Sequence, residues 1–339
     1  MPRKTKVNHI TSAEKTALIN KNNLRLKNDF LAYLKSIQRS EGTINGYDND
    51  LLILFTYIME NLGNKDFQKL TKRDIVSLQN WLVNNGNSPA RIRRIKSAIS
   101  SLSNYCEDIL SDDEPEFYGY RSTVKKIGNP TLQPVRDKTV WSDEELDSLL
   151  STLLERMQYE KACFVALAMY SGRRKAELCR FKMSDFSEDK IVCDGALYKS
   201  SPILTKGQKY LECYTLTKKF TPYLNLWIQY REKNNIESEW LFPNKNNPKE
   251  HISISTINSW AISLSNISKK DFYFHSLRHY YCSALIRAGI PDNVIVMIVG
   301  WTTAEMLKIY NDNPKDDQIA MYFKDGDIAT PNQKGFEDM

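Results

Sequence analysis

Two side chains that can bind an anion, His275 and Arg278, lie three residues apart at the head of a segment with helical apolar periodicity. On a helix, this spacing places both side chains on the same face. The first turn of a helix also carries the positive end of its dipole. The pair therefore predicts a pocket for an anion at the beginning of this helix.

The chain after this helix continues an ordered series of signals. Residues 292–299 predict a short helix that is closed by Gly300, and Trp301 follows at once. A T-x-x-E capping box at Thr302 then predicts the start of a last helix. Tyr310 lies about two turns into that helix.

Two further groups of basic residues lie upstream. In the stretch Y-S-G-R-R-K-A-E-L, Arg174 comes three residues before Glu177. Residues 203–216 predict a β-hairpin with Lys206 at its turn, and Lys209 is the rival lysine there.

In this order, the arginine box, the hairpin lysine, H-x-L-R-H, G-W and the tyrosine resemble the signature of the tyrosine recombinases, the integrase family of DNA strand-exchange enzymes. The resemblance implies an enzyme that breaks and rejoins DNA through a covalent 3′-phosphotyrosine, without a metal or cofactor. It implies six catalytic residues: Arg174, Lys206, His275, Arg278, Trp301 and Tyr310.

The implied roles suit the chemistry of a phosphodiester. Arg174 and Arg278 would neutralise the charge that develops on the phosphate oxygens, because guanidinium forks hold phosphate bidentately. Lys206 would protonate the leaving 5′-oxygen and Tyr310 would be the nucleophile. His275 and Trp301 would complete the pocket as hydrogen-bonding groups.

Other residues near these motifs are interpreted as structural support or as departures from the pattern. Glu177 is expected to orient an arginine, and His279 to support neighbouring side chains. Trp301 stands where most bacterial members have a second histidine. Arg173 replaces a usual apolar residue beside Arg174, which leaves open a register shifted by one; the spacing to Glu177 favours Arg174.

Length and composition indicate a two-domain protein without a membrane span. The 339 residues are 41% hydrophobic and 26% charged, and no apolar run approaches the ~20 residues that a span requires. No secretory leader precedes the polar N-terminal sequence, so we expect a cytoplasmic protein. The six scattered cysteines form no metal-binding or disulfide pattern.

The expected fold is mainly α with a small antiparallel β-sheet, in the two-domain architecture of a helical core-binding domain and an α+β catalytic domain. Helical periodicity and capping signals divide the chain as follows: a basic flexible tail, 1–23; a SAM-like helical DNA-binding domain, 24–110; a linker, 111–138; the catalytic domain, 139–325; and a C-terminal tail, 326–339.

DNA binding is predicted from the distribution of charge. Residues 1–27 hold seven Lys or Arg against one Glu, a balance of +6 that equals the net charge of the chain, so they could form a phosphate-binding arm or only a solubilising tail. A helix that begins at Pro89 carries four cations opposite an isoleucine face. These cations could bind phosphates, or they could simply form a solvated helix face. The residues expected to contact DNA are Thr43, Arg91, Arg93, Arg94 and Lys96.

The expected partners are double-stranded recombination sites and other copies of the chain. Exchange between two duplexes requires four protomers, so we expect a monomer in solution and a homotetramer on paired sites, with an excisionase or a DNA-bending protein as possible accessories. The apolar patch 319–323 would link neighbours, or pack on its own domain. The expected role is integration or excision of a phage or other mobile element. The alternatives are a Xer-like resolvase, a type IB topoisomerase-like enzyme and a non-catalytic DNA-binding protein.

Overall fold

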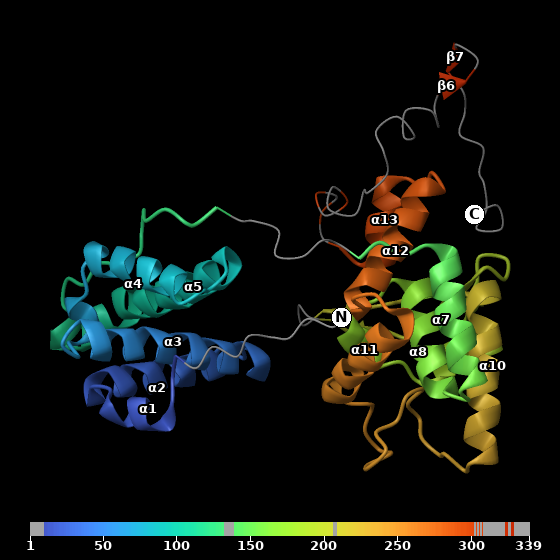
Figure 1. The fold of residues 1–339 in the computed structure, drawn as a ribbon, viewed down its shortest axis with the longest axis horizontal. Coiled ribbons are helices and arrows are strands. Elements are labelled where there is room, and N and C mark those ends of the chain that lie inside the picture. The colour runs from blue at the N-terminus through green and yellow to red at the C-terminus, as the bar shows by residue number, and fades with distance from the viewer. Residues whose placement is uncertain are drawn as a thin grey trace. The chain divides into compact units, whose positions relative to one another are not determined.

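The computed structural model describes residues 10–131, 139–205 and 209–301, and then residues 303, 305, 307, 323–324 and 327–328. The chain divides into two compact units at about residue 137 (Figure 1). Both units are mainly helical, and the short strands all pair antiparallel. The expected fold class, mainly α with small antiparallel sheets, is confirmed.

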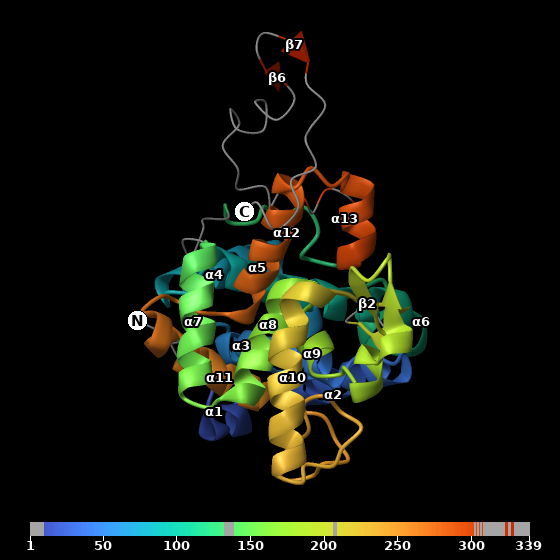
Figure 2. The same ribbon diagram turned by 90° about the vertical axis from the view of Figure 1, so that its right-hand side faces the viewer.

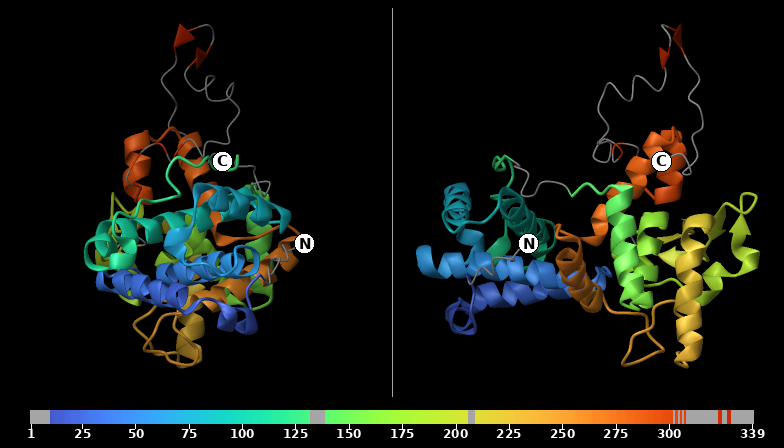
Figure 3. Two further views of the ribbon diagram at one scale, coloured as in Figure 1. Left: turned by 90° about the vertical axis from the view of Figure 1, so that its left-hand side faces the viewer. Right: turned by 45° about the vertical axis from the view of Figure 1, so that its right-hand side comes forward.

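The N-terminal unit is a helical bundle. Its helices are α1 (Ala13–Leu18), α2 (Lys21–Ser36), α3 (Glu41–Asn61), α4 (Lys72–Asn84), α5 (Pro89–Tyr105) and the short α6 (Ser111–Asp113). A capping box between Thr71 and Asp74 starts α4, as the sequence predicts. Helices α2 and α3 lie side by side, drawn in blue in the right panel of Figure 3, and α3 also packs on α5.

The expected flexible tail, residues 1–23, is folded in the part that the structure describes. Helix α1 begins after Ser12, whose side chain accepts a hydrogen bond from Lys15 N, and α2 already begins at Lys21. Ile10 and Ile19 are buried in the core of the bundle. Burial of these isoleucines outweighs the polar composition of the segment, so the prediction of a tail is wrong for residues 10–23.

The expected linker, 111–138, also packs on the bundle as far as residue 131. Phe117, Tyr120 and Val124 are buried in the same core as Leu102. The Pro- and Gly-rich composition misled the prediction because turn residues occur in packed loops as well as in linkers.

The C-terminal unit is built on the buried helix α8 (Tyr159–Ser171), which packs against α7 (Asp143–Glu155), α10 (Thr217–Lys233) and α12 (Phe274–Arg287) (Figure 2). Its other helices are α9 (Lys175–Leu178), α11 (Ile254–Ser268) and α13 (Asp292–Val299). The predicted capping box of Ser142 and Glu145 starts α7, and Gly300 closes α13 at φ 72°.

Two small antiparallel sheets lie between α9 and α10 in the sequence. The first has the order β1 (Ile191–Val192), β2 (Leu197–Lys199), β5 (Tyr214–Leu216), and the second is the hairpin of β3 (Ile203–Leu204) and β4 (Tyr210–Leu211). The predicted hairpin over 203–216 is therefore too long, because only β3 and β4 form it, whereas β5 pairs with β2.

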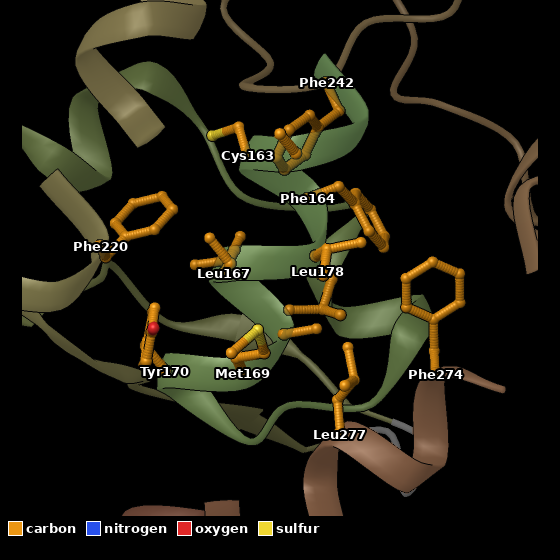
Figure 4. Close-up of a cluster of buried hydrophobic side chains, with 14 of the residues drawn as sticks. Cys163, Phe164, Leu167, Met169, Tyr170, Leu178, Phe220, Phe242, Phe274 and Leu277 are labelled. Carbon is orange, nitrogen blue, oxygen red and sulfur yellow. The ribbon is translucent and has the colours of Figure 1, made fainter. Parts of the chain in front are cut away.

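The core of this unit fixes the orientation of α12. Phe274 and Leu277 of α12 point into a cluster that is centred on Phe164 and Leu167 of α8 (Figure 4). Phe274 packs edge-on against Phe164, with ring centroids 5.1 Å apart. This burial fixes the rotation of α12 and, with it, the placement of His275 and Arg278.

Strands β6 (Phe323–Lys324) and β7 (Asp327–Ile328) pair near the C-terminus. The predicted helix that begins at Thr302, together with Tyr310, lies almost entirely outside the described residues, as do the tail and most of the patch 319–323. Within the described part of the chain, none of the helices has the length and apolar character needed to span a membrane.

Candidate active site

The first arginine box occupies a sharp turn between α8 and α9. Gly172 ends α8 in a left-handed conformation, at φ 59°. A Cβ atom at this position would lie 2.3 Å from Cδ1 of Tyr281, so the turn requires glycine for both its conformation and its packing. The turn directs the next two side chains, Arg173 and Arg174, to different environments.

Arg174 is the accessible arginine of the two. Its Nη1 donates to Oε1 of Glu177 at 3.0 Å, and its backbone N donates to Oε2 of the same carboxylate at 3.3 Å. Glu177 is 1% exposed, whereas 34% of the Arg174 side chain is open to solvent. The carboxylate thus holds Arg174 and leaves part of its guanidinium reachable.

Arg278 lies one turn into α12 and is fully buried. Its Nη1 donates to the Gly172 carbonyl at 2.9 Å, and its Nη2 donates to the Val299 carbonyl at 3.2 Å. The guanidinium also lies 5.3 Å from the ring centre of Trp301, which is largely buried. Arg278 therefore joins the arginine-box turn to the end of α13, and a phosphate would reach it only if its surroundings rearranged.

His275 lies beside these cations with an exposed side chain. Its ring packs edge-on against that of His279, with centroids 5.2 Å apart. Desolvation and the neighbouring His279 lower the pKa of His275 to about 4, and the charges of Arg278 and Arg174 act in the same direction. Because the ring remains open to solvent, the positive neighbours are the firmer cause. His275 is therefore neutral at pH 7.

In the hairpin expected to carry the catalytic lysine, hydrogen bonds continue past the strands to the two residues that flank the turn. Thr205 donates to the carbonyl of Lys209 from both its backbone N, at 2.8 Å, and its Oγ1, at 2.9 Å. Lys206 and Tyr310 lie outside the described residues. The structure thus brings together Arg174, His275, Arg278 and Trp301, with Glu177 and His279 beside them.

The predicted DNA-binding cations of α5 all have acceptors within their own unit. Asp50 pairs with Arg91 and with Nε of Arg94, the latter at 2.9 Å, and Arg93 donates to the Pro130 carbonyl at 2.9 Å. Arg94 is the most exposed, with 56% of its side chain open to solvent.

Lys96 differs from the other three cations because it is buried. Its Nζ donates to the carbonyls of Ile127 and Gly128 at 2.8 and 2.7 Å, and desolvation lowers its pKa. Lys96 therefore holds residues 127–128 against the bundle, which argues against a phosphate contact. Thr43 is exposed near the start of α3, and its hydroxyl lies 2.8 Å from that of Ser40.

Arg173 and Arg180 have structural roles beside the site that the sequence did not indicate. Arg173 is buried and donates to the carbonyls of Glu212 and Ile298, at 2.8 and 3.0 Å. Arg180 donates to the Leu204 carbonyl of the hairpin at 2.6 Å. The burial of Arg173 could have been predicted from its place at a usually apolar position of the motif, because such a position is usually buried.

A cavity of about 670 Å³ lies elsewhere in this unit and is lined by Trp227, Tyr230 and Trp260 among others. Its lining includes none of the predicted catalytic residues that the structure describes. Within the described ranges, no group of three or more His, Cys, Asp or Glu side chains is arranged to hold a metal ion.

The chain is similar in sequence and fold to known recombinases. Residues 28–108 match the phage integrase N-terminal SAM-like domain. A tyrosine recombinase of Thermosipho africanus is 27% identical over 303 residues, which cover 85% of this chain and 93% of that protein. Among solved structures, XerH site-specific recombinase bound to a palindromic difH substrate has a TM-score of 0.65 at 16% identity and covers 90% of this chain and 89% of its own.

A lambda integrase tetramer bound to a Holliday junction has a TM-score of 0.62 at 15% identity, covering 87% of this chain and 77% of that one. At these identities the solved structures establish the fold. Residues 140–316, more than half of the chain, match the Phage integrase family. The chain therefore belongs to the phage integrase family, the family of the tyrosine recombinases.

Proposed function

We propose that this chain is a site-specific DNA recombinase that cuts and rejoins strands through a covalent bond between Tyr310 and a 3′-phosphate. The observation that carries the proposal is the meeting of Arg174, Arg278 and a neutral His275 from two distant segments of the chain. Two guanidinium groups and an imidazole suit a phosphodiester that gains negative charge during attack.

In the proposed reaction, the phenolic oxygen of Tyr310 attacks phosphorus, and the bond from phosphorus to the 5′-oxygen breaks. The neutral imidazole of His275 accepts the phenolic proton. The ammonium of Lys206 gives a proton to the departing 5′-oxygen. The products are a 3′-phosphotyrosine and a free 5′-hydroxyl, and attack by a 5′-hydroxyl in the reverse direction rejoins the strand.

The two arginines have different starting positions in this scheme. Arg174 is partly exposed and can meet a phosphate oxygen directly. Arg278 is buried against two carbonyls, so it joins the phosphate only after a local rearrangement on DNA binding. The indole N–H of Trp301, which lies over Arg278, would donate to the same phosphate.

The N-terminal bundle is proposed to hold the DNA duplex. Arg94 offers the most exposed cation of α5, and Thr43 is exposed near the start of α3. Because one site of this kind breaks one strand, exchange between two duplexes requires four protomers. We propose a monomer in free solution and a homotetramer on paired sites, in line with the tetramer described for lambda integrase.

Two biological roles fit this chemistry. Integration or excision of a mobile element is the first role, supported by the match of residues 140–316 to the Phage integrase family, and resolution of chromosome or plasmid dimers is the alternative. An excisionase or a DNA-bending protein would accompany the first role. An adjacent attachment site in the genome would favour the first role over the second.

Covalent capture tests the proposal. On a suicide substrate nicked beside the scissile phosphate, the wild type should form a protein–DNA adduct that survives denaturant, and Tyr310→Phe should form none. Tyr118→Phe, at an exposed tyrosine without a proposed role, is the matched control and should retain the adduct, which should also form in EDTA. An undiminished adduct with Tyr310→Phe would overturn the assignment of the nucleophile.

A further inference from the structure

Arg173 connects three segments of the C-terminal unit through one buried guanidinium. Only 1% of its side chain is exposed. Its Nη2 donates to two backbone carbonyls, that of Glu212 at 2.8 Å and that of Ile298 at 3.0 Å. Its Nη1 lies 4.0 Å from Oε2 of Glu177, the carboxylate that also orients Arg174.

The two carbonyls belong to the segments that flank the proposed chemistry. Glu212 follows β4 directly and so stands on the C-terminal arm of the hairpin that carries Lys206. Ile298 lies in the last turn of α13, just before Trp301. The carbonyl end of a helix is also where a cation is favoured by the helix dipole.

Packing around Gly300 shows how closely these parts meet. A Cβ atom at Gly300 would lie 2.8 Å from Nη1 of Arg173 and 3.1 Å from Cδ1 of Leu211 in β4. The end of α13, the guanidinium and the hairpin arm are thus in direct contact. An apolar side chain in place of Arg173 would fill this space without holding either carbonyl.

Resting on the recombinase function proposed above, we propose that Arg173 is a positioning residue that holds the Lys206 hairpin in register with the arginine box. The hairpin is the part most sensitive to its loss. Arg278 still holds the end of α13 through the Val299 carbonyl, whereas the Glu212 carbonyl loses its donor. Arg180 would retain the other arm through Leu204.

A substrate that needs no general acid tests this role. Replacing the bridging 5′-oxygen by sulfur gives a leaving thiol whose pKa is about 8.5, so the thiolate departs without a proton. On ordinary DNA, Arg173→Met should slow cleavage by about tenfold to a hundredfold, less than the about 10²- to 10⁴-fold that general acid catalysis contributes, because Lys206 is misplaced and not removed. On the sulfur-substituted DNA, its rate should return to within about threefold of the wild type.

Two controls separate this inference from the proposed function. Lys206→Ala should be slow on ordinary DNA and rescued by sulfur, whereas Arg174→Ala should be slow on both substrates. If Lys206→Ala is not rescued, the proposed general acid is wrong. If Lys206→Ala is rescued and a folded Arg173→Met is not, Arg173 does not position the hairpin and the inference is overturned.

Loss of a buried cation could also unfold the protein, so a second variant is needed. Arg173→Lys keeps the charge beside Glu177 but can no longer offer a planar fork. It should fold, as judged by an unchanged circular dichroism spectrum, and show the same rescue by sulfur with a smaller defect on ordinary DNA. A folded Arg173→Lys with wild-type cleavage of ordinary DNA and no response to sulfur would contradict the inference.

Discussion

Each unit of this molecule places a buried carboxylate between two arginines, but the two centres leave their cations in different environments. In the N-terminal unit, Asp50 is 2% exposed and pairs with Arg91 and Arg94. Both arginines remain partly open to solvent, at 29% and 56% of their side chains. This centre holds two cations at a surface.

In the C-terminal unit, Glu177 lies between two cations of unequal exposure. Arg173 is buried and joins backbone segments, whereas Arg174 is partly exposed. A surface centre of the first kind suits attraction of phosphates over an area. A centre of the second kind suits the binding of one phosphate at a fixed position, because contacts with the backbone hold the centre in place.

The largest effect should follow removal of each carboxylate charge. Glu177→Gln leaves the buried Arg173 without a counter-ion, so we expect a loss of about 3–5 kcal/mol in the free energy of unfolding. Asp50→Asn should cost less, about 1–3 kcal/mol, because Arg91 and Arg94 can turn to water. Denaturant unfolding of the full chain measures both values. Equal losses would mean that the two centres do not differ as their exposure indicates.

Removal of the exposed arginine of each centre should separate catalysis from binding. Arg174→Ala should lower the cleavage rate by about a hundredfold or more, while DNA binding persists, because a missing donor costs about 3 kcal/mol in the transition state. Arg94→Ala should leave cleavage at saturating DNA unchanged. It should instead reduce the salt dependence of binding by about one log-log unit. Gel-shift titrations at several salt concentrations check this, and an unchanged slope would make the surface centre purely structural.

A smaller difference should appear with pH. The neutral form of His275 is the competent base, and its lowered pKa of about 4 keeps it neutral below the usual value near 6.5. On the acid side, kcat/KM for cleavage should therefore decrease only at a pH below 6.5. The affinity for DNA through α5 should not change between pH 5 and 8. In Arg174→Ala one positive neighbour is lost, so the acid limb should move to higher pH. An acid limb at the same pH in this variant would show that the charge of Arg174 does not act on His275.

Features set by nearby residues could be predicted from the sequence. The capping boxes at Thr71 and Ser142 start their helices, and Gly300 ends α13, because these hydrogen bonds and this backbone conformation involve residues within one turn. The order of the motifs was sufficient to identify the family. Composition failed for residues 10–23 and 111–131, since a few buried apolar side chains decided where those segments pack.

Tertiary structure alone decided the roles of two neighbouring arginines. Arg173 and Arg174 have the same chemistry and adjacent positions, and the sequence supports Arg174 only through its spacing to Glu177. The acceptors of Arg173 lie 39 and 125 residues away, at Glu212 and Ile298. The motif position of Arg173 could indicate burial, but its acceptors depend on which distant segments meet around the side chain, and no local pattern carries that information.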